Sequence, residues 1–162
     1  VYNSAFNTDR WQFVGSAQKI RRSSVRTVMH EIGHALERRA SLIAFCRYKK
    51  AHEKLNRRIK TFNRSRKKSN KEAAAIRREK NRLDLMVKRI EDLTENSPVI
   101  REYRKVAPKG ASPTVYGETS DHESFAESFS LFRTDPAALG RVLPKVLAWF
   151  ERGQHLKAMG EN

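Results

Sequence analysis

The chain has 162 residues, enough for one compact domain with a modest hydrophobic core. Only 38% of the residues are apolar and 32% are charged, so we expect part of the chain to lie outside that core. Cys46 is the only cysteine, which excludes a disulfide framework and a cysteine-based zinc cluster and leaves histidine and carboxylate side chains as metal ligands. Cys46 itself is expected to be a small buried side chain.

The formal charge of +16 is concentrated in one segment. Residues 47–92 contain eighteen Lys and Arg against six Asp and Glu, a balance of +12 in less than a third of the chain. Such a basic field favours contact with nucleic acid, an anionic membrane surface or an acidic protein, although a solvated helix pair without a ligand has the same pattern. No apolar run reaches the ~18 residues that a membrane span needs, and the N-terminal segment lacks the order of a signal peptide, so a soluble protein is expected.

The first predicted elements are a short strand and a helix. Residues 11–14, WQFV, are the best strand candidate. From Ser24 onward apolar residues recur with the period of a helix, and the hydroxyls of Ser23 and Ser24 are candidate N-caps. The same period continues to Phe62 with basic residues on the other faces, until the polar segment 63–70 interrupts it.

A second helix is predicted after this interruption. Its apolar stripe runs from Ile76 to Leu93, and the Asn-Ser-Pro at 96–98 should end it. Two antiparallel helices joined by a basic turn form a hairpin with a narrow apolar seam. We therefore assign residues 47–95 to a basic helical hairpin.

The C-terminal part is predicted to begin with a loop and to continue as helices. Proline and glycine recur through 99–119, which predicts loop. The helices that follow should start at a Ser120 or Asp121 cap, at Pro136 and at Pro144. Phe125, Phe129 and Phe132 should face the core, and Gly153 should stop the last helix. The fold class is thus mostly α with a small β element, in which 1–46 and 96–162 form one discontinuous domain around the inserted hairpin.

The segment HEIGH, residues 30–34, is the strongest chemical signal. On a helix His30 and His34 project from the same face and can bind one metal ion, while Glu31 lies to the side of an open coordination position. The alternative is a half-buried helix whose histidines hydrogen-bond to neighbouring side chains. The following residues, ALERRA, lack the Gly and His of the metzincin extension, which excludes that class.

A catalytic zinc site needs a third protein ligand. Glu53 follows His34 by nineteen positions, but it lies among basic residues of the hairpin. Glu123 lies on a helix with an apolar face, and Glu127 follows one turn later. One glutamate of this pair can bind the metal while the other holds a ligand histidine, so Glu123 is the favoured ligand. His122, adjacent to Glu123, should point away from the site on this helix and lie at the surface.

Three segments together resemble a known family. HEIGHA at 30–35, Tyr116, and ESFAESF at 123–129, with Glu123 seven positions after Tyr116, resemble the gluzincin peptidase domain of anthrax lethal factor and its relatives, which include bacterial Pro-Pro endopeptidases. The resemblance covers residues 11–46 and 108–150, and the hairpin has no counterpart in the family pattern. It implies a zincin-like metallopeptidase core with Zn²⁺ as cofactor. The implied roles are metal binding by His30, His34 and Glu123, activation of water by Glu31, donation to the oxyanion by Tyr116, and support of a ligand histidine by Glu127.

The resulting functional prediction is a zinc-dependent endopeptidase acting on a protein or peptide substrate. An initial valine, a short domain and a strong positive charge suit a toxin or effector module of a larger protein, secreted or injected and acting in a target-cell cytoplasm. The hairpin would then recruit substrate or bind an acidic inhibitor such as an immunity protein. The alternative is a nucleic-acid-binding or virion-associated protein in which the basic hairpin acts and the zincin core is a scaffold.

Overall fold

The computed structural model describes residues 10–14, 18–22, 24–67 and 69–160, and this part of the chain is mostly helical, as predicted. The chain divides into two compact units. One combines the residues up to 38 with those from 97 onward, and the other is 39–96. The predicted boundary between residues 46 and 47 falls inside a helix of the second unit.

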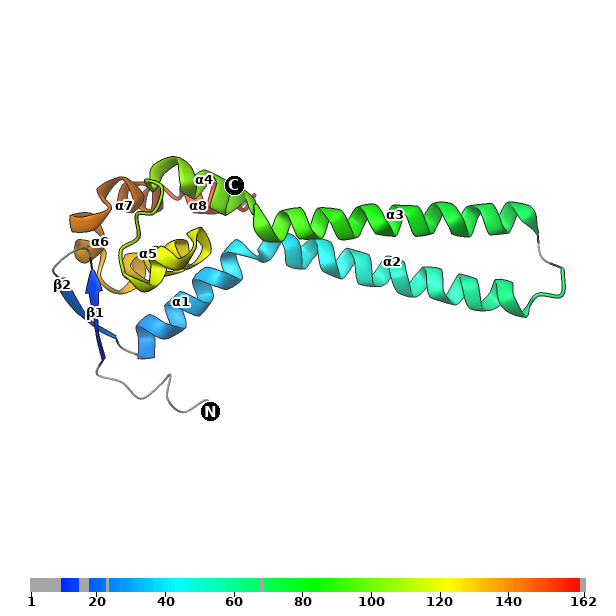
Figure 1. Cartoon of the computed structure of the whole chain (residues 1–162), viewed down its shortest axis with the longest axis horizontal. Coiled ribbons are helices and arrows are strands. Elements are labelled where there is room, and N and C mark those ends of the chain that lie inside the picture. The colour runs from blue at the N-terminus through cyan, green and yellow to red at the C-terminus, as the bar shows by residue number, and fades with distance from the viewer. Residues whose placement is uncertain (1–9, 15–17, 23, 68, 161–162) are drawn as a thin grey trace. The chain divides into compact units, whose positions relative to one another are not determined.

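The first unit is a helical assembly that also contains a pair of antiparallel strands, with Gln12 opposite Ile20 (Figure 1). Ser23, one of the two expected caps of the first helix, lies outside the described residues. The elements of this unit are β1 (Arg10–Val14), β2 (Gln18–Arg22), α1 (Ser24–Glu37), α4 (Pro98–Val106), the 3-10 helix η2 (Tyr116–Thr119), α5 (Asp121–Thr134), α6 (Pro136–Val142), α7 (Pro144–Glu151) and α8 (Gln154–Ala158).

Helix starts follow local capping chemistry. The Ser120 hydroxyl accepts a hydrogen bond from the backbone N–H of Glu123 at 3.1 Å, which confirms one of the two caps predicted for α5. α6 begins at Pro136, as predicted, and the Asp135 carboxylate caps it by accepting a hydrogen bond from Ala138 at 2.9 Å. The predicted loop at 99–119 is wrong in its first part, because α4 occupies 98–106. Ser97 caps α4, and proline stands in its first turn, so the sequence Ser-Pro begins a helix here.

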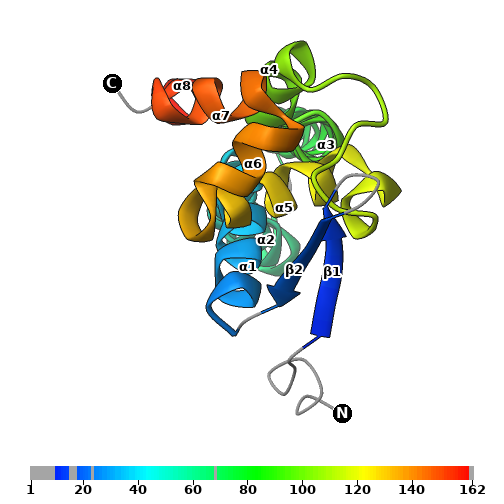
Figure 2. The same cartoon turned by 90° about the vertical axis from the view of Figure 1, so that its left-hand side faces the viewer.

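Helix α5 is the centre of the first unit. It contacts α1, η2, α4, α6 and α7, and Figure 2 shows it among the helices of the first unit. Phe125 and Phe129 are buried, as predicted, with 0% and 7% of their surface exposed, and the partly buried Phe132 packs against the same core. On another side of α5, the Tyr103 hydroxyl lies 2.8 Å from the hydroxyls of both Ser124 and Ser128. These contacts fix α5 between α4 and the aromatic core.

The second unit is a helical hairpin, as the sequence predicts for this region. α2 (Arg39–Arg64) and α3 (Asn70–Glu95) run antiparallel and pack along a seam in which Leu55 and Leu83 are buried. The expected burial of Cys46 is wrong, because this residue is exposed. Two helices bury only one stripe each, and Cys46 lies outside it. Among the described residues, neither this hairpin nor any other helix has the length and apolarity that crossing a membrane requires.

His155 gives a pH test of this core. It is buried beside the ring of Phe150, with 5.1 Å between ring centroids. Burial, together with the Arg133 guanidinium, holds the pKa of His155 below its ordinary value. Below about pH 6.5 His155 therefore takes up a proton more readily in the unfolded chain than in the folded one. The free energy of unfolding consequently decreases as the pH is lowered.

We expect His155→Phe to remove this contribution. Denaturant titrations of variant and wild type should show the stability difference moving in favour of the variant between about pH 8 and about pH 5. A stability difference that is identical at both pH values would contradict this assignment.

Candidate metal centre

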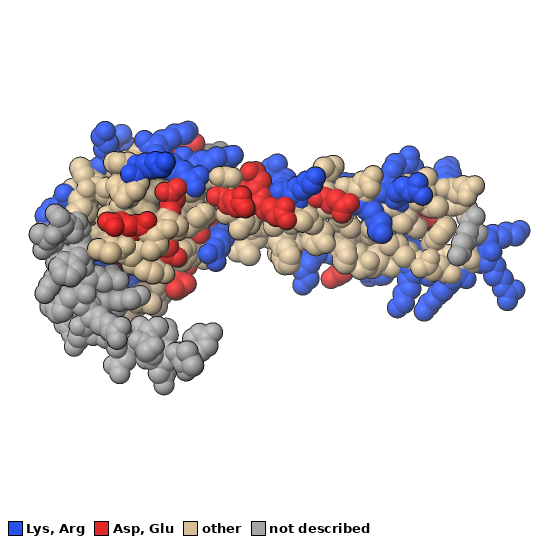
Figure 3. Space-filling model, in the orientation of Figure 1, with Lys and Arg blue, Asp and Glu red and all other residues tan. Residues whose placement is uncertain are grey.

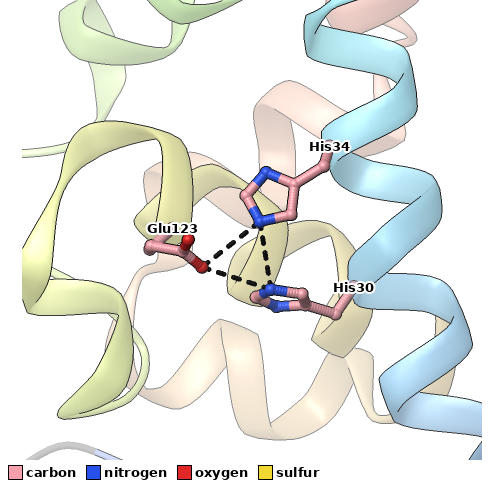
Figure 4. A group of neighbouring side chains, drawn as sticks. All are labelled: His30, His34 and Glu123. Carbon is pink, nitrogen blue, oxygen red and sulfur yellow. Dashed lines mark hydrogen bonds and ion pairs between the residues drawn. The ribbon is translucent and has the colours of Figure 1, made fainter. Parts of the chain in front are cut away.

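Three side chains from two helices converge at one point. His30 and His34 lie one turn apart on α1, and Glu123 comes from the first turn of α5 (Figure 4). The Nε2 atoms of the two histidines are 3.1 Å apart. Oε2 of Glu123 lies 3.2 Å from Nε2 of His30 and 3.3 Å from Nε2 of His34. Within the described part of the chain, these three form the group whose ligand atoms could share a metal ion.

His30 is held from behind by a buried ion pair. Its Nδ1 atom lies 2.8 Å from Oε1 of Glu127, and Oε2 of Glu127 accepts a hydrogen bond of 2.8 Å from the Arg26 guanidinium. The side chains of Arg26 and Glu127 are each 4% exposed. Burial acts to raise the pKa of Glu127, but His30 and Arg26 outweigh it and lower that pKa. Glu127 thus lies beside a histidine of the cluster, as predicted, whereas Arg26 was not predicted to take part.

His34 has an equivalent carboxylate, which was not predicted from the sequence either. Its Nδ1 donates to Oε1 of Glu37 at 3.3 Å, and Glu37 is completely buried at its side chain. Burial acts to raise the pKa of Glu37, but hydrogen bonds from His122 and His34 outweigh it and lower that pKa to about 2. The hydrogen bond to Glu37 also raises the pKa of His34. The signal in the sequence is spacing, because Glu37 follows His34 by three positions on the same helix face.

His122 was expected to point away from the site as a surface residue, and this expectation is wrong. Its Nδ1 contacts Oε2 of Glu37, and its side chain is 26% exposed. Residues 122 and 123 do diverge around α5, but the end of α1 passes close enough for Glu37 to meet His122 while His34 meets Glu123. One buried carboxylate therefore joins α1 to α5 next to the metal-ligand group.

The arrangement of nitrogen and oxygen atoms makes this cluster suited to binding a cation. A carboxylate oxygen lies next to Nδ1 of each histidine, at 2.8 Å for His30 and 3.3 Å for His34, and this favours the tautomer in which each Nε2 carries a lone pair. Two such nitrogens and a carboxylate oxygen repel one another unless a proton or a metal ion lies among them. Zn–N bonds of about 2.0–2.1 Å at tetrahedral angles place ligand atoms about 3.3 Å apart. The observed separations of 3.1, 3.2 and 3.3 Å match this spacing.

Gly33 sets the distance between α1 and α5, the two helices that carry the candidate ligands. A β-carbon on this residue would lie 2.9 Å from Cα of Ala126 on α5, closer than side chains tolerate. The absence of a side chain thus lets α1 and α5 touch backbone to backbone. The hydroxyl of Ser130 also donates to the backbone carbonyl of Arg26 at 2.7 Å, which fixes the same pair of helices near the start of α1.

Tyr116 and Glu31, the other two predicted site residues, lie at exposed positions. The ring of Tyr116 is 5.9 Å from that of His30, with 48% of the residue exposed. Gly117 places it there, because its backbone N–H donates to Thr114 and a β-carbon would overlap the Ser112 hydroxyl. Glu31 follows the first ligand histidine on α1.

The alternative ligand, Glu53, is not part of this cluster. It is exposed on α2, which belongs to the other compact unit. The structure therefore assembles the predicted set with Glu123 and without Glu53. Searches against protein families, curated proteins and solved structures find no match for the chain. The interpretation of the site accordingly depends on its own geometry.

Gly33→Ala should disturb this centre. The added methyl group must push α1 from α5, so we expect zinc affinity to fall by at least about tenfold, as when ligand support is lost in other sites. Zinc affinity would be measured by competition with a chromophoric chelator.

Gly140→Ala is the matched control, since its β-carbon would meet only the end of the flexible Leu147 side chain in the first unit. It should leave zinc affinity unchanged. Equal affinities for the two variants would contradict the role given to Gly33.

Proposed function

We propose that the protein is a zinc-dependent endopeptidase of the gluzincin type. The observation that carries this proposal is the convergence of His30, His34 and Glu123 at 3.1 to 3.3 Å, with a carboxylate behind each histidine. Structural zinc sites are normally closed by four protein ligands, whereas catalytic sites use three and keep one position open. A three-ligand set therefore favours catalysis over a structural role.

The two buried carboxylates support this donor set. Glu127 and Glu37 lie on the Nδ1 side of their histidines, and their position favours an orientation in which both imidazoles point toward Glu123. Each carboxylate is in turn held by a further group, Arg26 in one case and His122 in the other. Preorganisation of this kind reduces the reorganisation that metal binding requires, and it makes the imidazoles better donors.

A bound zinc ion would supply Lewis acidity, which makes a water molecule nucleophilic near neutral pH and polarises a peptide carbonyl. Glu31 is placed beside the first ligand on α1 and is exposed to an incoming substrate. Its carboxylate would accept a proton from the attacking water and deliver it to the amine of the departing peptide. Tyr116, whose ring lies 5.9 Å from that of His30, would donate its phenol hydrogen to the oxygen that gains negative charge.

The substitution Glu31→Gln separates chemistry from metal binding. We expect the variant to retain one zinc ion per chain and to lose peptide hydrolysis by at least about a hundredfold in kcat, because the proton acceptor is absent. Metal content and cleavage of a generic peptide library would be measured on the same preparation. Glu123→Gln should instead lower zinc affinity as well. Normal hydrolysis by zinc-loaded Glu31→Gln would disprove the proposal.

The substitution Glu37→Gln tests the carboxylate behind His34. An amide can still accept a hydrogen bond but carries no charge, so zinc affinity should fall about 10- to 100-fold. Chelator competition against the wild type gives the measurement. The exposed Glu151→Gln on α7 is the charge-matched control and should bind zinc normally. Unchanged affinity in Glu37→Gln would show that this carboxylate has only a structural part.

A further inference from the structure

The helical hairpin contains a hollow between its two helices. Its volume is about 320 Å³, and it is open to the surface. α2 and α3 each contribute four of the eight lining residues, so the hollow lies entirely within the hairpin unit. The lining residues are Arg47, Ala51, Lys54, Leu55, Glu79, Arg82, Leu83 and Met86.

The floor of this hollow is apolar for a simple packing reason. Each helix has 26 residues and is about 39 Å long, but two helices can cover only one stripe of each other. Leu55 and Leu83 meet in the seam and are buried, at 4% and 8% exposure. Beside them Ala51 is too small to fill the space between the helices, and Met86 lines the wall opposite. The result is an open groove of the kind that a third helix fills in a helical bundle.

The rim of the groove is basic. Arg47, Lys54 and Arg82 line it, and all three are exposed. The acidic residue of the lining, Glu79, is 3.1 Å from the Arg58 guanidinium, which offsets its charge. Figure 3 shows Lys and Arg side chains along the hairpin, with Asp and Glu side chains among them and Lys and Arg predominating toward the turn. An occupant of the groove must therefore combine an apolar surface with negative charge.

We propose that this groove binds an acidic amphipathic helix of a partner protein. Apolar side chains on one face of that helix would fill the space above Leu55 and Leu83, and its flanking carboxylates would meet Arg47, Lys54 and Arg82. This is the helix-in-groove mode of recognition, in which apolar anchors supply affinity and charges supply orientation and partner choice.

The chemistry of the lining separates this occupant from nucleic acid. Phosphates would engage the basic rim but leave the apolar floor empty. Single-stranded nucleic acid binds best where aromatic rings stack on its bases, and the eight lining residues include none. A helix with an apolar stripe uses both the floor and the rim.

The test uses the full chain and three synthetic probes at about 0.15 M salt. The first is a labelled helical peptide of about 21 residues with leucine on one face and glutamate on the other. The second is polyglutamate of the same length, and the third is duplex DNA of similar charge. We expect the leucine-containing peptide to bind at least about tenfold more tightly than either of the others.

Two Ala→Glu variants then locate the binding site. Ala51→Glu places a carboxylate in the groove and should weaken the peptide by at least about tenfold, because it fills the hollow and repels the acidic ligand. Ala74→Glu makes the same charge change at an exposed position of α3 outside the groove and should weaken it by less than about threefold. Circular dichroism of both variants confirms that the hairpin stays helical.

Three outcomes would overturn the proposal. They are tighter binding of duplex DNA than of the peptide, equal affinity for the peptide and polyglutamate, and equal effects of the two variants. The first outcome would assign the hairpin to nucleic acid. The second would mean that its charge alone attracts polyanions.

Discussion

Helix α1 meets α5 so closely at Gly33 that a β-carbon there would lie 2.9 Å from the backbone of Ala126. The other features of the candidate metal centre depend on this contact. At ordinary helix separations, with side chains between the axes, Glu123 would stand too far from the two histidines to complete a triangle of 3.1 to 3.3 Å. The glycine within HEIGH thus has a structural reason that is independent of the zinc-binding pattern.

Charge balance is the second constraint on this centre. Glu37 and Glu127 are buried, and a buried carboxylate without a partner would be strongly destabilising. Each therefore lies between two nitrogen-bearing side chains. These are His30 and Arg26 for Glu127, and His34 and His122 for Glu37. The carboxylates fix the histidines, and the histidines keep the carboxylates ionised. The contacts that keep these buried carboxylates ionised are therefore the same contacts that position the candidate metal ligands His30 and His34.

The comparison between sequence and structure shows which interactions are local. Two pairs, His30 with His34 and Glu123 with Glu127, could be predicted from the sequence because each pair is separated by four positions, about one helical turn. His122 was misjudged because its partner, Glu37, lies 85 positions away, and only the approach of α1 to α5 brings them together. Arg26 was missed for the same reason, since its carboxylate partner is 101 positions away.

Errors in the secondary structure have a similar origin. The apolar period runs without interruption from α1 into α2, so the end of α1 at Glu37 could not be seen in the sequence. The prolines and glycines after residue 107 led to a loop prediction that wrongly included the short helix α4. That helix is stabilised by burial of Ile100 and Tyr103 in the core, which is a tertiary effect.

The antiparallel course of α2 and α3 has a consequence for how the chain folds. His34 and Glu123 are separated by 89 positions, and closing so long a loop costs conformational entropy. Most of that separation is the hairpin, whose contacts are local and can form early. Once α2 and α3 have paired, the chain enters and leaves this unit at the same end, so residues 38 and 97 behave as the ends of a short connection. Early formation of the hairpin thereby shortens the effective loop between α1 and α4 and lowers the entropic cost of assembling the first unit.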